Sequence, residues 1–391
     1  MTNARRLLVV ALGAGALAAC PAQACAQRIK LSASFKDLQQ VARRDSNDAA
    51  AHYNLGLAYW NRKRWDEVER AFRTAVDIEY RFALAHLGLS FLQSARLEEV
   101  ADRERKLGDS TLVTAAVEER RRLYQRAIMF DPFVDHRLAG AIPRPRALRG
   151  MILIRFWSGY GQALTDLADG KEEQAYRRLS KVLDAYGTQR DTAPAGLLWL
   201  HALASVRTDR PEEASPDLEA LVKQAERRET DSTAMDLRAK EYRYALALLR
   251  QRTGQIDEAE GLYRDVLGED LGMYMVHVRL ADLYETGGAW DLALAEREEA
   301  LALNPDDPTS MLELGLTLGK AGRLAAADSA LRAAARAAPR DARVPYYLGL
   351  VAVARHQPDV AREAFERFLA LAPSRYADRI ADARRRLDAL P

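Results

Sequence analysis

The sequence predicts an all-α fold, an α-solenoid of helix-turn-helix repeats that ends in a capping helix. Three observations predict it. One pattern returns every 34 residues between Lys240 and Arg375, and a period of this size is typical of solenoids. Within each copy the apolar residues follow the spacing of an amphipathic helix. Glycine and proline stand at matching positions between the helical segments, where they mark turns and helix ends.

The columns of the repeat indicate how each copy folds. The recurring leucines are Leu246, Leu280, Leu314 and Leu348, and the small residues after them are Ala247, Ala281, Gly315 and Gly349. The turn glycines are Gly254, Gly288 and Gly322, and the closing prolines are Pro305, Pro339 and Pro373. A small residue lets the first helix of a copy lie close against the second, because no side chain holds the two backbones apart. Each copy is therefore expected to be a helical hairpin.

This run resembles the tetratricopeptide repeat. The resemblance is carried by the pair Leu314 and Gly315, the aromatic Tyr284, the alanine Ala327 of the second helix and the closing Pro339. It implies a right-handed superhelix whose concave surface is lined by the first helix of each repeat. It also implies a protein that binds other proteins and catalyses nothing.

The first 26 residues have the features of a targeting segment, with basic residues followed by the apolar run Leu7–Ala19. Two processing sites remain open. Leu17–Cys20 resembles a bacterial lipobox, which would leave a lipid on Cys20, whereas Ala24–Ala26 fits an A-x-A site that releases a soluble chain. Either route predicts export, to the periplasm or the outer membrane. No cysteine lies beyond residue 25, so the folded part cannot hold a disulfide framework or a cysteine metal site.

The rest of the chain divides by pattern. The expected segments are a capping helix in 27–48, repeats with a helical insertion in 49–134, a basic Pro/Gly linker in 135–150, degenerate repeats in 151–230, four regular repeats in 240–375 and a capping helix in 376–391. Within the second repeat, 97–106 is expected to be a separate charged helix. The linker is interpreted as a solvated connector, or else as a surface for anionic lipid or a partner. The whole array is expected to be one extended object.

Composition and motifs exclude several classes of function. The chain has 58 Lys+Arg against 56 Asp+Glu, a balance that argues against a nucleic-acid surface. No catalytic motif is present, and no cofactor or metal site is expected. His52, His86 and His277 hold the same position in separate repeats, so we expect structural roles for them, and we expect His201 to lack a partner. Membrane contact is expected only through a lipid on Cys20.

The resemblance implies that partners bind in the concave groove. Aromatic and aliphatic side chains there would suit a peptide with apolar anchors. The residues predicted to bind a partner are Tyr53, Leu57, Trp60, Asn61, Phe91, Tyr244, Leu248, Leu312, Leu316 and Tyr346.

The sequence thus predicts a non-enzymatic scaffold or adaptor in the bacterial cell envelope, which binds a partner protein or peptide. The alternative is an enzyme or ligand-binding module within the irregular middle, residues 97–228. Self-association through an apolar groove is a third hypothesis.

Overall fold

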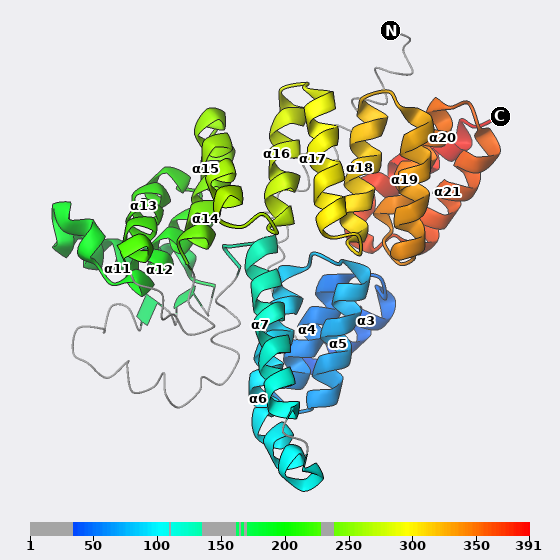
Figure 1. Cartoon of the computed structure of the whole chain (residues 1–391). Coiled ribbons are helices and arrows are strands. Elements are labelled where there is room, and N and C mark those ends of the chain that lie inside the picture. Colours follow the sequence, from blue (N-terminus) through cyan, green and yellow to red (C-terminus); the bar gives the residue numbers. More distant parts are fainter. Residues whose placement is uncertain (1–33, 109–110, 135–161, 164–165, 168–169, 228–237) are drawn as a thin grey trace. The chain divides into compact units, whose positions relative to one another are not determined.

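The computed structural model describes residues 34–108, 111–134, 162–163, 166–167, 170–227 and 238–391. Every regular element among these residues is a helix, which confirms the all-α, helical-repeat fold; Figure 1 labels most of the helices. Cys20, the targeting segment and the basic linker at 135–150 lie outside the described residues. None of the described helices is both long and apolar enough to cross a membrane.

The chain divides into two compact units. The first combines the N-terminal part up to Ala85 with His277–Pro391, and the second spans His86–Val276. The expectation of one undivided array is therefore wrong. The first repeat belongs to the same unit as the last repeats because it packs against them and not only against its neighbours in sequence.

The first unit holds three helices from the start of the chain and the hairpins from its end. Its helices are α3 (Phe35–Arg44), α4 (Ala49–Trp60), α5 (Trp65–Ile78), α17 (Trp290–Leu303), α18 (Pro308–Lys320), α19 (Leu324–Ala337), α20 (Arg343–Ala354), α21 (Pro358–Leu371), the short η2 (Ser374–Tyr376) and α22 (Ala377–Asp388), with most of α16 (Tyr274–Thr286). Within it, α4 packs on α5, α18 on α19 and α20 on α21, and α22 covers α21.

The second unit holds the longest helices and the irregular repeats. Its helices are α6 (Ala83–Leu107), most of which lies in this unit, α7 (Leu112–Phe130), α11 (Glu172–Leu183), η1 (Asp184–Thr192), α12 (Ala195–Arg207), α13 (Pro211–Arg227), α14 (Ala239–Arg252) and α15 (Ile256–Glu269). Here α12 packs on α13, α13 on α14 and α14 on α15.

Close packing of the hairpins α4–α5, α18–α19 and α20–α21 depends on glycine. A Cβ atom built on Gly56 would lie 2.5 Å from the ring of Phe72, and one on Gly315 would lie 2.7 Å from Leu331 Cγ. On Gly349 it would lie 2.6 Å from the ring of Phe365. Real Cβ atoms do not approach carbon so closely, so in these three hairpins the two helices lie closer together than a side chain at this position would allow.

The turn inside each regular hairpin has a residue with a left-handed backbone. Gly254, Gly288 and Gly322 have φ values of 79°, 74° and 79°, and glycine adopts this region without strain. The same turn position is taken by Lys63 with φ 56° and by His356 with φ 57°. The repeat geometry therefore fixes the turn even where the sequence does not supply glycine.

The second repeat differs from expectation. Residues 97–106 do not form a separate inserted helix, because α6 runs without a break through 25 residues from Ala83 to Leu107. The returning helix α7 has 19 residues. The additional residues lengthen both arms of this hairpin.

Candidate partner-binding site

Six of the ten predicted groove residues are buried. Tyr53, Trp60 and Leu312 are each 2% exposed, Tyr244 is fully buried, and Tyr346 and Leu57 are 7% and 8% exposed. The Tyr53 ring stacks on Phe72 at 5.3 Å, and the Tyr346 ring lies 5.1 Å from Phe368. The Tyr244 hydroxyl donates to the carbonyl of Met129. These six side chains hold their hairpins together, so the expectation that they face an open groove is wrong for this structure.

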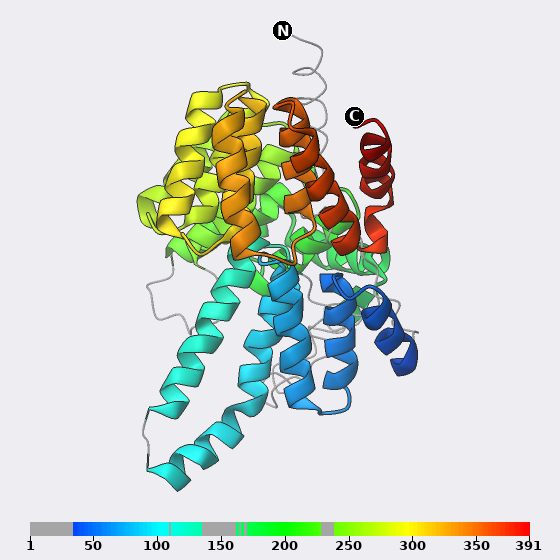
Figure 2. The same ribbon diagram turned by 90° about the vertical axis from the view of Figure 1, so that its right-hand side faces the viewer.

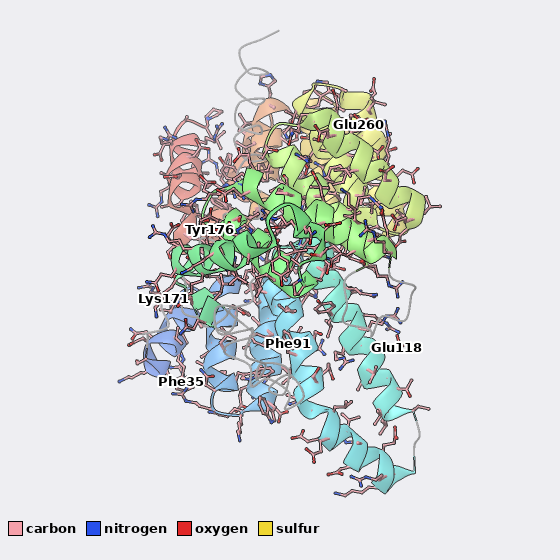
Figure 3. All side chains as sticks on the ribbon, turned by 90° about the vertical axis from the view of Figure 1, so that its left-hand side faces the viewer. Phe35, Phe91, Glu118, Lys171, Tyr176 and Glu260 are labelled. Atoms are coloured by element: carbon pink, nitrogen blue, oxygen red, sulfur yellow. The ribbon has the colours of Figure 1, made fainter. Side chains whose placement is uncertain are left out.

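The other four remain accessible to differing degrees. Asn61 is exposed, whereas Phe91 (on α6, Figure 3), Leu248 and Leu316 are partly buried. Asn61 and Leu316 belong to the first unit, and Phe91 and Leu248 to the second. Each stays a predicted partner contact.

The repeat register shows an unexpected residue in α17. The large residue that packs beneath the small residue of the first helix comes sixteen positions after it, as in Phe72, Leu331 and Phe365. Tyr263 fills the matching position in α15 and is fully buried. In α17 the same position is Arg297, which is 4% exposed. A charge therefore stands where the other regular hairpins place an apolar or aromatic side chain.

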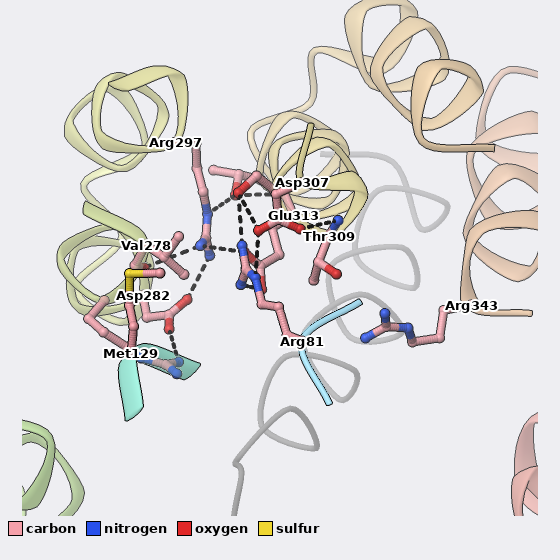
Figure 4. Close-up of polar contacts among 12 residues, drawn as sticks. Arg81, Met129, Val278, Asp282, Arg297, Asp307, Thr309, Glu313 and Arg343 are labelled. Carbon is pink, nitrogen blue, oxygen red and sulfur yellow. Dashed lines mark hydrogen bonds and ion pairs between the residues drawn. The ribbon is translucent and has the colours of Figure 1, made fainter. Parts of the chain in front are cut away.

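Each nitrogen of the Arg297 guanidinium donates at least one hydrogen bond, and Nε donates to Thr317 Oγ1 (Figure 4). Nη2 donates to Asp282 Oδ1 at 2.6 Å and to Glu285 Oε1 at 2.9 Å. Nη1 donates to Glu313 Oε2 and to the carbonyl of Val278, both at 3.2 Å. Asp282 and Glu285 lie on α16, whereas Glu313 lies on α18, so a single side chain joins two consecutive hairpins.

Electrostatics explains why a charge is tolerated at this buried position. Burial opposes ionisation of Arg297, but Asp282, Glu313 and Glu285 outweigh it and raise the pKa of the guanidinium. Burial also opposes ionisation of Glu285, yet Arg297 and Lys320 hold the pKa of its carboxyl below the usual value. Lys320 Nζ lies 2.5 Å from Glu285 Oε2. A buried ion is stable only with such partners.

The network continues to Arg81, in the connection between α5 and α6. Arg81 Nε donates to Asp307 Oδ2 at 2.7 Å, Nη1 to both Glu313 oxygens at 3.0 Å and Nη2 to Ser310 Oγ at 2.8 Å. Asp307 is fully buried and caps α18 by accepting from the Thr309 amide at 2.8 Å. The N-terminal repeat is thus tied to the first turns of α18.

A second polar cluster lies in the second unit. His201 Nδ1 lies 2.5 Å from Asp217 Oδ2 and Nε2 lies 3.0 Å from Ser180 Oγ. Arg190 also donates to Asp217, at 2.5 Å. The expectation that His201 lacks a partner is wrong. The order serine, histidine, aspartate matches a hydrolase triad, but Ser180 Oγ donates to the Tyr176 carbonyl of its own helix, and His201 is 2% exposed.

An aromatic row crosses the same unit. Trp199 lies on α12 and Tyr242 on α14, the first helices of two successive hairpins. Their ring centroids are 5.6 Å apart, and Phe133 stacks on Trp199 at 5.8 Å with an interplanar angle of 3°. All three are partly buried against the core of this unit. The sequence did not predict this row, because Trp199 and Tyr242 hold different positions in the repeat and only the packing of the helices brings them together.

The histidines of the repeats have separate partners. His277 Nδ1 lies 2.6 Å from Glu296, the His86 ring meets Phe130 edge to face, and His52 bonds to the carbonyl of Ser46. Among the described residues, no group of three or more His, Cys, Asp or Glu side chains could hold a metal ion.

The described structure belongs to the class of all-α helical-repeat proteins. A family model described as "Tetratricopeptide repeat" matches residues 32–79, 244–308 and 312–376. The chain is a tetratricopeptide-repeat protein, and repeats of this kind support a role in protein interaction. A search of curated proteins finds no match.

Solved structures with a similar fold include other repeat proteins. A chain of MamA (41 to the end) from Desulfovibrio magneticus RS-1 is 21% identical, with a TM-score of 0.39 over 45% of this chain and 94% of that one. A tetratricopeptide repeat protein from Parabacteroides merdae is 14% identical, with a TM-score of 0.43 over 75% of this chain and 98% of that one. A chain of the APC/C hetero-tetramer Cut9–Hcn1 is 13% identical, with a TM-score of 0.44 over 89% of this chain and 81% of that one.

Proposed function

We propose that this protein is a non-enzymatic scaffold, exported to the bacterial cell envelope, that holds a partner protein or peptide on the first helices of its repeats. The observation that carries the proposal is the aromatic row of Phe133, Trp199 and Tyr242. Trp199 and Tyr242 lie on the first helices α12 and α14, and their partly exposed rings offer large, rigid contact area to an apolar anchor of a partner. Phe91, Leu248 and Leu316 extend the set of accessible apolar side chains on first helices.

Binding is tested by crosslinking and affinity capture from envelope extracts. The mature chain is compared with separate Trp199→Ala, Leu248→Asp and Leu316→Asp variants. The matched control is Leu271→Asp, because Leu271 is 75% exposed and lies in the connection between α15 and α16 rather than on a first helix. Tyr53→Asp is unsuitable, since a charge on a buried ring would unfold the repeat. A partner lost in a first-helix variant and kept in the control supports the proposal.

Export is tested on the same cells. The proposal expects the protein in the periplasmic or outer-membrane fraction, with an N-terminus at a lipidated Cys20 or at Gln27. Mass spectrometry of the purified chain distinguishes the two. An uncleaved chain that begins at Met1 and fractionates with the cytoplasm would contradict export.

A hydrolase in the irregular middle is the second candidate, because Ser180, His201 and Asp217 form a hydrogen-bonded series. We propose instead that this series fixes α11, α12 and α13 to one another. The Ser180 hydroxyl donates to the Tyr176 carbonyl of its own helix, and the His201 side chain is buried. A serine-directed fluorophosphonate probe should leave Ser180 unlabelled; labelling that His201→Ala abolishes would establish the hydrolase.

A further inference from the structure

Residues from the two ends of the chain meet in the first unit. Figures 1 and 2 show α3–α5 in blue beside the ends of the orange and red helices α18–α22. The pairs of residues in contact are 226 to 329 positions apart. A solenoid derives its stability from contacts between successive repeats, so this contact is additional to the repeat fold.

One part of the contact is Arg81 at the start of α18. Its side chain is 12% exposed and the Asp307 side chain is fully buried. Arg297 holds Glu313 from the opposite side, at 3.2 Å, and Asp307 is fixed by its capping bond. Arg81 therefore enters a pocket of oxygen atoms that other residues already hold in place.

The second part lies at the starts of α20 and α22. Arg340 donates to the Ser46 carbonyl at 2.6 Å and to Asn47 Oδ1 at 3.2 Å. Arg375 lies 3.4 Å from Glu79 and 3.5 Å from Asp48. Asp45 accepts from the Ser374 hydroxyl at 2.9 Å. Here Arg375 of the C-terminal part meets the acidic Asp48 and Glu79 of the N-terminal part, whereas at α18 the cation, Arg81, comes from the N-terminal part.

The chemistry of this contact differs from that between neighbouring helices. Neighbouring helices share buried apolar cores, such as the cluster of Leu331, Tyr346 and Phe365. The hydrogen bonds and ion pairs between the two ends join charged and polar groups, and the pairs of Arg375 are about a quarter exposed. The pairs of Arg375, whose side chains are 17% to 26% exposed, are weakened by salt more than the pair of Arg81 with the fully buried Asp307, and apolar cores are not weakened by it.

We propose that the N-terminal repeat is a detachable closing element, held on the C-terminal hairpins by the ion pairs of Arg81 and Arg375, and released as ionic strength rises while both parts stay folded. The hairpin α4–α5 keeps its own core of Tyr53, Phe72 and Phe82 when the contact opens. The C-terminal hairpins keep theirs. This inference is independent of the proposed partner site.

The test is a distance measurement on the full chain by pulsed electron spin resonance. Spin labels are placed on cysteines at the exposed positions Arg70 of α5 and Arg336 of α19, with Cys20 and Cys25 replaced by serine. In low salt we expect one narrow distance distribution. At about 1 M NaCl, where the Debye length is about 3 Å, a longer and broader distance should appear.

Variants assign the effect to the ion pairs. Arg81→Ala together with Arg375→Glu should raise the population of the longer distance by more than about tenfold, because each leaves a partner charge unpaired. Adding Glu79→Arg to Arg375→Glu should restore the short distance relative to Arg375→Glu alone. The control Arg332→Glu removes an exposed pair within α19 and should change nothing.

One result overturns the proposal without depending on any variant. If the wild-type distance stays narrow and unchanged up to about 1 M NaCl while circular dichroism shows an intact fold, the contact is a permanent part of the unit. Loss of helical signal together with the change in distance would equally contradict it, since the ends would then separate only by unfolding.

Discussion

Two adjacent hairpins of this protein have different side chains at the same buried position of the repeat. In α18–α19, Leu331 packs beneath Gly315 so tightly that a Cβ on the glycine would lie 2.7 Å from Leu331 Cγ. In α16–α17 the matching position is Arg297, held by Asp282, Glu285 and Glu313. Leu331 belongs to an apolar cluster that includes Tyr346 of the next hairpin, whereas Arg297 reaches the next hairpin through a hydrogen bond to Glu313. The same position of the repeat can therefore join successive hairpins through either an apolar or a charged side chain.

The largest expected effect comes from breaking that link. Arg297→Ala leaves the carboxylates of Glu285, Glu313 and Asp282 without their shared cation in a buried site. We expect a loss of about 3–5 kcal/mol in the free energy of unfolding, measured by urea denaturation. The control Arg332→Ala, which removes an exposed pair in α19, should cost less than about 1 kcal/mol. A loss for Arg297→Ala no larger than that of the control would show that the network contributes little.

Overpacking the apolar hairpin should come next. Gly315→Leu places a side chain against Leu331 and should destabilise the chain by about 1–3 kcal/mol or more, because the two helices must separate. Gly261→Leu in α15 is the matched control, since nothing lies within 4 Å of its added Cβ. Thermal unfolding of both variants measures the difference. Equal midpoints would contradict the register of the repeats.

The pH dependence should show a smaller effect at His52. Burial, followed by the nearby positive charge of Arg340, lowers the pKa of His52 from its usual 6.5, whereas the Ser46 carbonyl and Asp48 oppose the shift. The folded state then binds fewer protons than the unfolded state, so this contribution to stability is lost as pH falls below 6.5. The difference between the urea midpoints of wild type and His52→Gln should be constant above that pH and should shrink as the pH falls below it. Parallel pH profiles would contradict the assignment.

The smallest effect concerns the turns. Lys63 and His356 occupy the left-handed position that glycine holds in the other regular hairpins. Lys63→Gly and His356→Gly should each stabilise the chain by up to about 1 kcal/mol, since relief of strain exceeds the added freedom of the unfolded chain. Gly322→Ala is the reverse experiment and should destabilise by about 1–2 kcal/mol. Thermal midpoints that move in the opposite directions would show that these turns carry no strain.

The fold could be predicted from the sequence because residues at a fixed period mark the close contacts, turns and helix ends of the repeat. The glycine at 315, the turn at Gly322 and the proline at 339 each predict one local feature, and the period joins them. Arg297 could also have been found in this way, since it breaks a column of large apolar residues. The extended α6 could not, because a continuous helix and two helices with a short break have nearly the same periodicity.

The partner site was predicted less well. Whether a first-helix side chain faces the groove or the neighbouring helix depends on the tilt between hairpins, which the period does not fix; Tyr53 and Tyr346 proved to be buried. The contact of Arg81 with Asp307 left no signal in one sequence, because 226 residues separate the two. The triad-like order of Ser180, His201 and Asp217 likewise arises only when three helices pack.

The most direct test of the polar link is a double-mutant cycle between Arg297 on α17 and Glu313 on α18. The free energy of unfolding is measured for wild type, Arg297→Ala, Glu313→Ala and the double variant. If one arginine joins the two hairpins, the sum of the losses in unfolding free energy of the two single variants should exceed the loss of the double variant by about 1–3 kcal/mol. Losses that add to within about 0.5 kcal/mol would contradict the account, because the hairpins would then be held together without this pair.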